Sequence, residues 1–318
     1  MNKEGGFNIF NRFLRTLIFM TGVCLLPLKQ SQQADASPWV LPKERLVVSA
    51  TTGFSRAQHE FINDKEGTRQ RFPLEGDLRV YSLRLGSRYG LKDKLELEVR
   101  ATFQALTYSA ESFIKEDQLI SINTSEMGLG DIELKLTRQL ISGRWPLSFQ
   151  GGIKLPTGYS LPEPNRLALG SGQADLIGIL QFGHLFSNGT LLGVEGGGVL
   201  RLKGPGHQLK YSVKVAQRLV GHTFFFVAQS GFHSMTDGEN TGLFNRVSKT
   251  PLLEADLFNI EDTYLLPFSL TQDLHQLELG FFLGTQSKVE YSAVLIVPWA
   301  GRNVTQVISF FWGINHPL

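Results

Sequence analysis

The sequence predicts an all-β fold, a transmembrane antiparallel up-and-down β-barrel of about 12 strands. Polar and apolar residues alternate with a period of two from about residue 75 to the end of the chain. After the first 36 residues, no apolar run approaches the length of about 20 residues that a membrane-spanning helix needs. Those first 36 residues have the features of a secretory signal peptide, which indicates that the chain is exported.

The clearest alternation runs through residues 95–105. One face carries the apolar residues Leu95, Leu97, Val99, Ala101, Phe103 and Ala105, and the other carries Glu96, Glu98, Arg100, Thr102 and Gln104. Only a strand places successive side chains on opposite faces. Many such strands in one chain are typical of a membrane barrel, whose outer face meets lipid and whose inner face meets water.

The N-terminus is expected to be removed, which leaves residues 37–318 as the outer-membrane β-barrel. A signal peptide, residues 1–36, is predicted from the cationic residues Lys3, Arg12 and Arg15, an apolar core at 16–28, and the cleavage site Ala-Asp-Ala before Ser37. An uncleaved N-terminal anchor is the alternative. Lipidation of Cys24 is not expected, because Val23 stands where a lipidation signal needs a small residue.

The composition narrows the function classes. Cys24 is the only cysteine, so the exported chain is expected to hold no disulfide and no cysteine-based metal site. The formal charge is +2, from 31 basic and 29 acidic residues, and the absence of a basic stripe argues against a nucleic-acid partner. The 33 glycines suit turns and strand bends, and the 23 phenylalanines suit a lipid-facing surface. No metal and no cofactor are predicted.

Turn residues divide the exported chain into twelve predicted strands. Their approximate ranges are 45–58, 76–89, 94–107, 131–140, 147–156, 173–185, 191–202, 209–219, 223–232, 274–284, 289–298 and 304–314. The connections after every second strand are short, whereas those at 59–75, 108–130, 157–172 and 233–273 are long. Because outer-membrane barrels have short periplasmic turns and longer extracellular loops, both termini are expected in the periplasm. The last strand ends in aromatic residues, a signal that barrel-assembly machinery is expected to read, although residues 315–318 follow it.

Three stretches resemble one protein family. They are Gly-Leu-Gly-Asp within 127–140, Lys-Leu-Pro-Thr-Gly within 151–158, and Gly-Ser-Gly-Gln-Ala-Asp within 169–176. In this order they resemble the "MetA-pathway of phenol degradation" family of bacterial outer-membrane barrels. The resemblance implies a transporter-like, porin-like barrel for small molecules, and the name of the family suggests apolar or aromatic solutes.

The same stretches also have a physical interpretation. Glycine allows tight backbone conformations where loops re-enter strands, and proline suits the end of a strand, where no ladder donor is needed. Asp131 and Asp175 are expected to begin strands that descend from the outer rim. We interpret them either as ligands for a cation or polar solute, or as rim residues bonded to nearby backbone. The predicted rim motif is Gly128, Gly130, Asp131, Pro156, Thr157, Gly158 and Asp175.

Parity along the strands predicts which polar residues face the lumen. The candidate lumen-lining residues are Arg84, Arg88, Glu96, Glu98, Arg100, Glu133, Lys135, Gln150 and Lys154, and Lys210 and Lys214 have the same parity. Pairing through the turn at 90–93 is expected to oppose Arg88 with Glu96 or Arg84 with Glu98, depending on register. The mixed charges indicate either a cross-braced interior or a solute-selective lining.

The sequence does not predict an enzyme. The histidines are His59, His184, His207, His222, His233, His275 and His316, and none forms a compelling pair with a serine. His233 and Ser234 are neighbours that would point to opposite faces of a strand. We find no Gly-x-Ser-x-Gly elbow, no His-Glu-x-x-His motif and no phosphate loop.

The function that these features favour is passive passage of small molecules through the outer membrane of a diderm bacterium. A non-transporting structural or adhesive barrel is the alternative, and an outer-membrane lipid hydrolase is a third hypothesis. The expected partners are outer-membrane lipid, a small-molecule solute and the barrel-assembly machinery, with no nucleic acid. The sequence specifies neither the solute nor the oligomeric state.

Overall fold

The computed structural model describes residues 38–61, 67–115, 118–120, 123–158, 167, 169–170, 172–202, 206–235, 272–285, 289–302 and 304–318. Among them, the helical structure is a single 3-10 turn, Pro73–Glu75. No helix in these ranges is long and apolar enough to cross a membrane. The proposed signal peptide lies outside the described residues.

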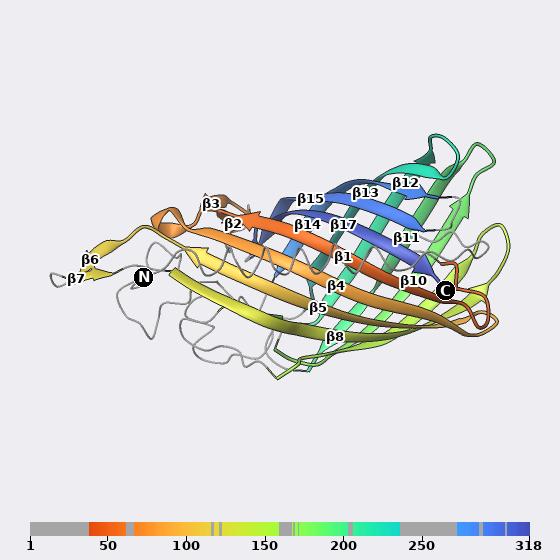
Figure 1. Cartoon of the computed structure of the whole chain (residues 1–318), viewed down its shortest axis with the longest axis horizontal. Helices are drawn as coiled ribbons and strands as arrows, with labels where there is room; N and C mark the ends of the chain where they lie inside the picture. Colours follow the sequence, from red (N-terminus) through yellow and green to blue (C-terminus); the bar gives the residue numbers. More distant parts are fainter. Residues whose placement is uncertain are drawn as a thin grey trace. The chain divides into compact units, whose positions relative to one another are not determined.

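Twelve strands close an antiparallel barrel within the described part of the chain (Figure 1). They are β1 (Leu46–Ala57), β4 (Asp77–Lys92), β5 (Leu95–Ser109), β8 (Asn123–Ile141), β9 (Leu147–Leu155), β10 (Asp175–Leu185), β11 (Thr190–Arg201), β12 (Gln208–Arg218), β13 (Thr223–Ser234), β14 (Asp273–Gly284), β15 (Glu290–Arg302) and β17 (Ile308–Pro317). Neighbours in the sequence pair with one another, and β1 pairs with β17 to close the ring. The predicted all-β, up-and-down barrel is therefore confirmed.

The last barrel strand, predicted at 304–314, lies three to four residues further along the chain, at Ile308–Pro317. Val304–Thr305 form a separate short strand, β16, which pairs with β2 (His59–Phe61). The chain leaves the barrel wall at this point, where the backbone N–H of Gln306 donates to the carbonyl of His59 in β2. The barrel strand β17 instead runs to Pro317, which lies opposite Val47, so most of the residues expected to trail behind the strand belong to the barrel wall.

The two ends of the barrel differ. At one end, here called the loop end, β2, β3 (Arg69–Arg71) and β16 form a small sheet, and β6 (Phe113–Lys115) pairs with β7 (Gln118–Ile120). At the other end, here called the turn end, the strands join through short connections, and β17 finishes there (Figure 1). The predicted loop 108–130 is shorter than expected, because β5 extends to Ser109 and β8 already begins at Asn123. Most of the predicted 233–273 loop lies outside the described residues.

The distribution of side chains is the reverse of that in a soluble protein. On the outer face, large apolar side chains are exposed, such as Phe103 (45%), Leu180 (51%) and Phe310 (50%). On the inner face, polar side chains are buried, such as Glu96 (3%) and Gln181 (5%). An outer belt of apolar residues around a polar interior is the arrangement of a transmembrane barrel.

Glu60 of the small loop-end sheet provides a test of pH dependence. Its side chain is buried, and burial raises the pKa of its carboxyl, an effect that the hydrogen bond from Gln70 partly offsets. A raised folded-state pKa stabilises the fold at low pH, and this stabilisation is lost as the pH rises through that pKa. Glu60→Gln is therefore expected to slow amide hydrogen exchange in β2 and β3 at pH 7, and to have little effect at a pH low enough to protonate Glu60. The exposed Glu111→Gln is the control, and an equal effect of both variants would contradict the prediction.

Candidate functional site

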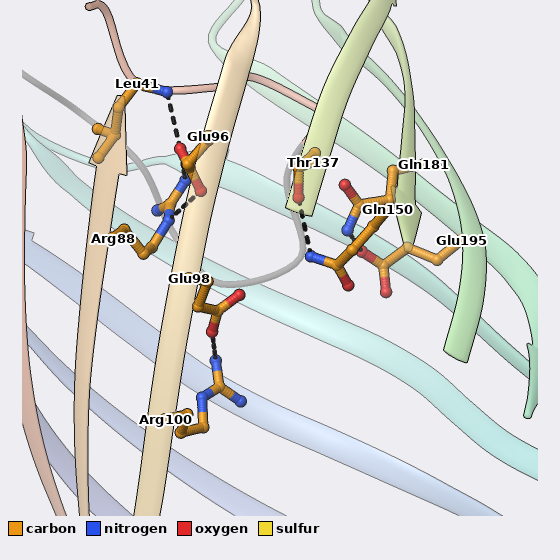
Figure 2. A network of polar contacts seen from close by, with 9 residues as sticks. All are labelled: Leu41, Arg88, Glu96, Glu98, Arg100, Thr137, Gln150, Gln181 and Glu195. Atoms are coloured by element: carbon orange, nitrogen blue, oxygen red, sulfur yellow. Dashed lines mark hydrogen bonds and ion pairs between the residues drawn. The ribbon is translucent and has the colours of Figure 1, made fainter. Parts of the chain in front are cut away.

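The inner face of β4 and β5 carries paired charges (Figure 2). Arg88 donates two hydrogen bonds to Glu96, from Nε to Oε1 at 2.7 Å and from Nη2 to Oε2 at 2.9 Å. Arg100 Nη2 donates to Glu98 Oε1 at 2.6 Å. Both carboxylates are almost fully buried. Bidentate and charge-assisted bonds of this kind fix side chains in one geometry.

The register of β4 and β5 differs from both predicted pairings. Arg88 lies directly opposite Glu98, and Arg84 lies opposite Thr102. The cause is an irregularity between Gly90 and Lys92 that shifts the register near the turn. Arg88 consequently forms its ion pair diagonally, with Glu96, which is two residues along β5 from the residue directly opposite. Arg84 instead stacks over Phe311, with its guanidinium carbon 5.6 Å from the ring centroid.

The charged network continues over β8, β9 and β10. Lys135 pairs with Glu133 at 2.5 Å. Lys154 lies between two carboxylates, 2.5 Å from Asp175 and 3.5 Å from Asp131. Each of these strands therefore contributes charge to a continuous inner surface of both signs.

Two amide side chains extend this polar surface. Gln150 donates to the hydroxyl of Thr137 at 3.0 Å, and Gln181 donates to Glu195 at 3.0 Å (Figure 2). Each of these bonds joins neighbouring strands. Side-chain bonds thus join β4 to β5, and they join β8 through β9 and β10 to β11.

The inner wall of β12–β14 is apolar toward the turn end. Ala216, Phe226 and Ala228 are buried there, and the rings of Phe226 and Phe282 stack with centroids 4.9 Å apart. Lys214 Nζ lies 4.9 Å from the centroid of Phe226, a cation–π contact that accommodates its charge. The interior is consequently amphipathic, with a charged wall facing an aromatic one.

The segment that precedes β1 enters the barrel at the turn end. Leu41 is 1% exposed, and its backbone N–H donates to Glu96 Oε2 at 2.7 Å. The hydroxyl of Ser148 donates to the carbonyl of Pro38. Glu96 belongs to β5 and Ser148 to β9, so residues 38–42 run along the inner surface between these strands.

Two inner-face glycines provide the space for this segment. A Cβ on Gly90 of β4 would lie 2.0 Å from the carbonyl oxygen of Pro42. A Cβ on Gly183 of β10 would lie 2.7 Å from Cγ of Pro38. Both positions therefore require glycine while the segment is in place. We define residues 38–42 as the N-terminal segment.

The loop end of the interior is filled by an apolar cluster. Its buried members are Ala57, Phe72, Leu78, Leu106, Tyr108, Leu167 and Leu169. Strands β1, β4 and β5 supply some of these residues, and the connections supply Phe72, Leu167 and Leu169. Side chains from connections therefore fold inward over the barrel wall, and the inner surface changes from charged to apolar toward this end.

The predicted rim motif is partly wrong in its location. Gly128, Gly130 and Asp131 lie within β8, where we expected a loop. The pairing of β5 with β8 is irregular near Thr102, and this irregularity accommodates extra residues of β8 without ending the strand. A Cβ on Gly130 would lie 2.5 Å from the carbonyl oxygen of Leu169. These glycines therefore make room for the inward-folded connection and do not open a turn.

The other motif residues lie close to the same place. The hydroxyl of Thr157 donates to the carbonyls of Leu129 and Gly130, at 2.7 and 2.9 Å. Gly158 has a φ of 92°, which favours glycine, and Pro156 follows the last residue of β9, as predicted. Asp175 is the first residue of β10. Asp131 and Asp175 share Lys154 as a partner, so both are held by a side chain as well as placed near the rim.

The structure thus brings most candidate residues together on one inner surface. Sequence reasoning missed the N-terminal segment, whose signal is an apolar, proline-bracketed stretch, Pro-Trp-Val-Leu-Pro, with no period of two. It also missed the aromatic wall formed by Phe226 and Phe282.

In the described part of the chain, the neighbours His233 and Ser234 do not form the serine–histidine pair that a hydrolase would need. His233 is exposed on β13, and the neighbouring Ser234 is buried on the other face, as predicted. His233 Nδ1 pairs with Asp273 at 2.8 Å. Within the described ranges, no group of three or more His, Cys, Asp or Glu residues is placed to hold a metal ion.

Comparison with known proteins shows the fold. No family model matches the sequence, and no curated protein matches it. Among solved structures, the chain is similar to the COG4313 outer-membrane channel of Pseudomonas putida F1, with a TM-score of 0.63 and 12% identity over 91% of this chain and 100% of that one. The fold is that of an outer-membrane barrel.

Autotransporter barrels show a weaker similarity. The β-domain of Bordetella BrkA has a TM-score of 0.47 and 9% identity, over 87% of this chain and 100% of that one. The translocator domain of NalP from Neisseria meningitidis has a TM-score of 0.43 and 10% identity, over 97% of this chain and 95% of that one. The resemblance to the MetA-pathway family stays a prediction.

Proposed function

We propose that this protein is an outer-membrane channel for the passive passage of small solutes, with its loop end outside the cell and its turn end in the periplasm. The observation that carries the proposal is the amphipathic interior of a closed transmembrane barrel. A charged wall opposite the rings of Phe226 and Phe282 suits solutes that combine an apolar body with a polar group. The similarity to a solved outer-membrane channel supports a channel role, and the resemblance to the MetA-pathway family suggests a preference for apolar or aromatic compounds.

A non-conducting structural barrel is the second candidate. Its support is that the N-terminal segment occupies the inner surface at the turn end and an apolar cluster fills the loop end. Ion pairs between neighbouring strands, Arg88 with Glu96 and Lys154 with Asp175 and Asp131, also brace the barrel wall.

Liposome swelling distinguishes these two candidates. Purified protein in proteoliposomes is expected to admit small aromatic acids and alcohols faster than sugars of similar size. Planar-bilayer recording provides the parallel measurement of ion conductance. A folded barrel that gives neither swelling nor conductance with any small solute would favour the structural candidate.

The charges of the inner wall are expected to set ion preference. Both signs line the wall, so the wild type should be weakly selective. Glu98→Gln removes one negative charge and the carboxylate that is hydrogen-bonded to Arg100, so the reversal potential under a salt gradient should shift toward anions. Fixed charges in a narrow, partly desolvated pore act at low effective dielectric, which makes a single change measurable.

Asp93→Asn is the matched control for this measurement. It also removes one negative charge, but from an exposed residue in a turn beyond the wall. An equal shift in both variants would mean that the inner wall does not govern selectivity.

A further inference from the structure

Lys210 stands apart from the other cations of the interior. It lies on the inner face of β12, directly opposite Gly197 of β11 and Phe232 of β13. The same row continues to Ile179 on β10 and to Leu274 on β14. An ammonium group therefore stands in a stretch of apolar neighbours, only partly shielded from the lumen.

Five other cations of the wall have a carboxylate directly across the strand pairing. These pairs are Arg88 with Glu98, Arg100 with Glu133, Lys135 with Glu98, Lys154 with Glu133 and Asp175, and Arg201 with Asp175. Arg84 and Lys214 have no carboxylate opposite them either, but each lies over an aromatic ring. Lys210 also has no carboxylate opposite it on either neighbouring strand. In the part of the chain that the structure describes, it makes no ion pair.

The charges around Lys210 do not cancel. Lys154, Arg201, Lys135 and Glu133 lie near enough to act on its charge. The carboxylates of Asp175 and Asp131 act in turn on Arg201, and both contact Lys154. With Glu98 opposite Lys135 and Arg100 opposite Glu133 included, five cations, counting Lys210, face four carboxylates, which leaves a net charge of +1. A charge without a partner in a partly desolvated site is unfavourable, and the binding of an anion lowers that cost.

We propose that Lys210 binds the carboxylate of a small apolar monocarboxylate, of the size and shape of benzoate, inside the lumen. The ammonium pairs with the carboxylate, and the apolar body lies against Phe232 and Leu274. A charge-assisted bond of this kind gives orientation and affinity together. The inference rests on the proposed function for its biological meaning, since it names the class of solute that the channel takes.

Binding to the purified, folded barrel tests this inference without requiring transport. Saturation-transfer NMR and isothermal titration are performed with benzoate and with its neutral relative benzyl alcohol. Wild type is expected to bind benzoate, and Lys210→Gln to weaken this binding roughly tenfold or more, the loss expected for one hydrogen bond to a charged group. Lys210→Arg, which keeps the charge, should restore most of the binding, and benzyl alcohol should bind all variants alike.

Lys214→Gln is the matched control, because Lys214 lies on the inner face of the same strand but is covered by aromatic rings. Folding of each variant is verified by heat-modifiable mobility in electrophoresis. Unchanged benzoate binding in Lys210→Gln, equal weakening in Lys214→Gln, or no benzoate binding by wild type would each overturn the inference. Lys210-dependent binding without any solute flux would uphold it and refute the channel function instead.

Discussion

Replacement of residues 38–42 by a glycine-serine segment of equal length is expected to raise the single-channel conductance of the reconstituted protein severalfold. The N-terminal segment occupies the inner surface at the turn end, where Leu41 is fully buried and bonded to Glu96, and Pro38 is bonded to Ser148. A flexible polar replacement loses the apolar burial that holds the segment in place, so it should leave the inner surface for part of the time. Planar-bilayer recordings measure the conductance and its fluctuations.

Two single substitutions provide a matched comparison for that result. Glu96→Ala and Glu98→Ala each remove an inner-wall carboxylate that pairs with an arginine, so each carries a similar penalty for a broken buried pair, about 3–5 kcal/mol. Glu96 also accepts a hydrogen bond from the N-terminal segment. Only Glu96→Ala is therefore expected to raise conductance. If the segment replacement leaves the conductance at the wild-type value, the segment is not an obstruction.

The alternation in the sequence was sufficient to predict the barrel, because the two faces of each strand meet different surroundings. Each outward side chain, such as Phe103, meets lipid, and each inward one, such as Glu98, meets a polar interior. Strand ends were less predictable, because a pairing irregularity near Gly130 lets β8 continue through a glycine-rich stretch that resembles a loop in sequence.

Side-chain partners within the wall depend on register, which parity does not determine. The register shift between Gly90 and Lys92 moved Arg88 opposite Glu98 and left its closest ion pair diagonal. The isolation of Lys210 has the same origin, since it follows from which residues of β11 and β13 lie opposite. Parity could place these side chains inside the barrel, but a one-step change in pairing alters every neighbour.

The N-terminal segment could not be predicted from local sequence pattern. Its bonds join residues 55 and 110 positions apart in the chain, and it belongs to no strand. The residues that contact this segment, such as Gly183 and Ser148, have no feature in the sequence that distinguishes them from other residues of their strands. Only the closed ring, which brings β5, β9 and β10 around one interior, shows that they form a single binding surface.

Val99→Arg is expected to destabilise the folded barrel by about 2–4 kcal/mol, the cost of a lipid-facing arginine near the membrane midplane. Val99 lies on the outer face of β5 and is 38% exposed there. Ser212→Arg is the control, because Ser212 lies on the inner face of β12 opposite Glu195, which can pair with the new charge. Thr102 is less suitable, since its cross-strand partner is Arg84. Equilibrium unfolding in urea from lipid vesicles, followed by tryptophan fluorescence, measures both free energies. If Ser212→Arg costs as much as Val99→Arg, the assignment of inner and outer faces is wrong.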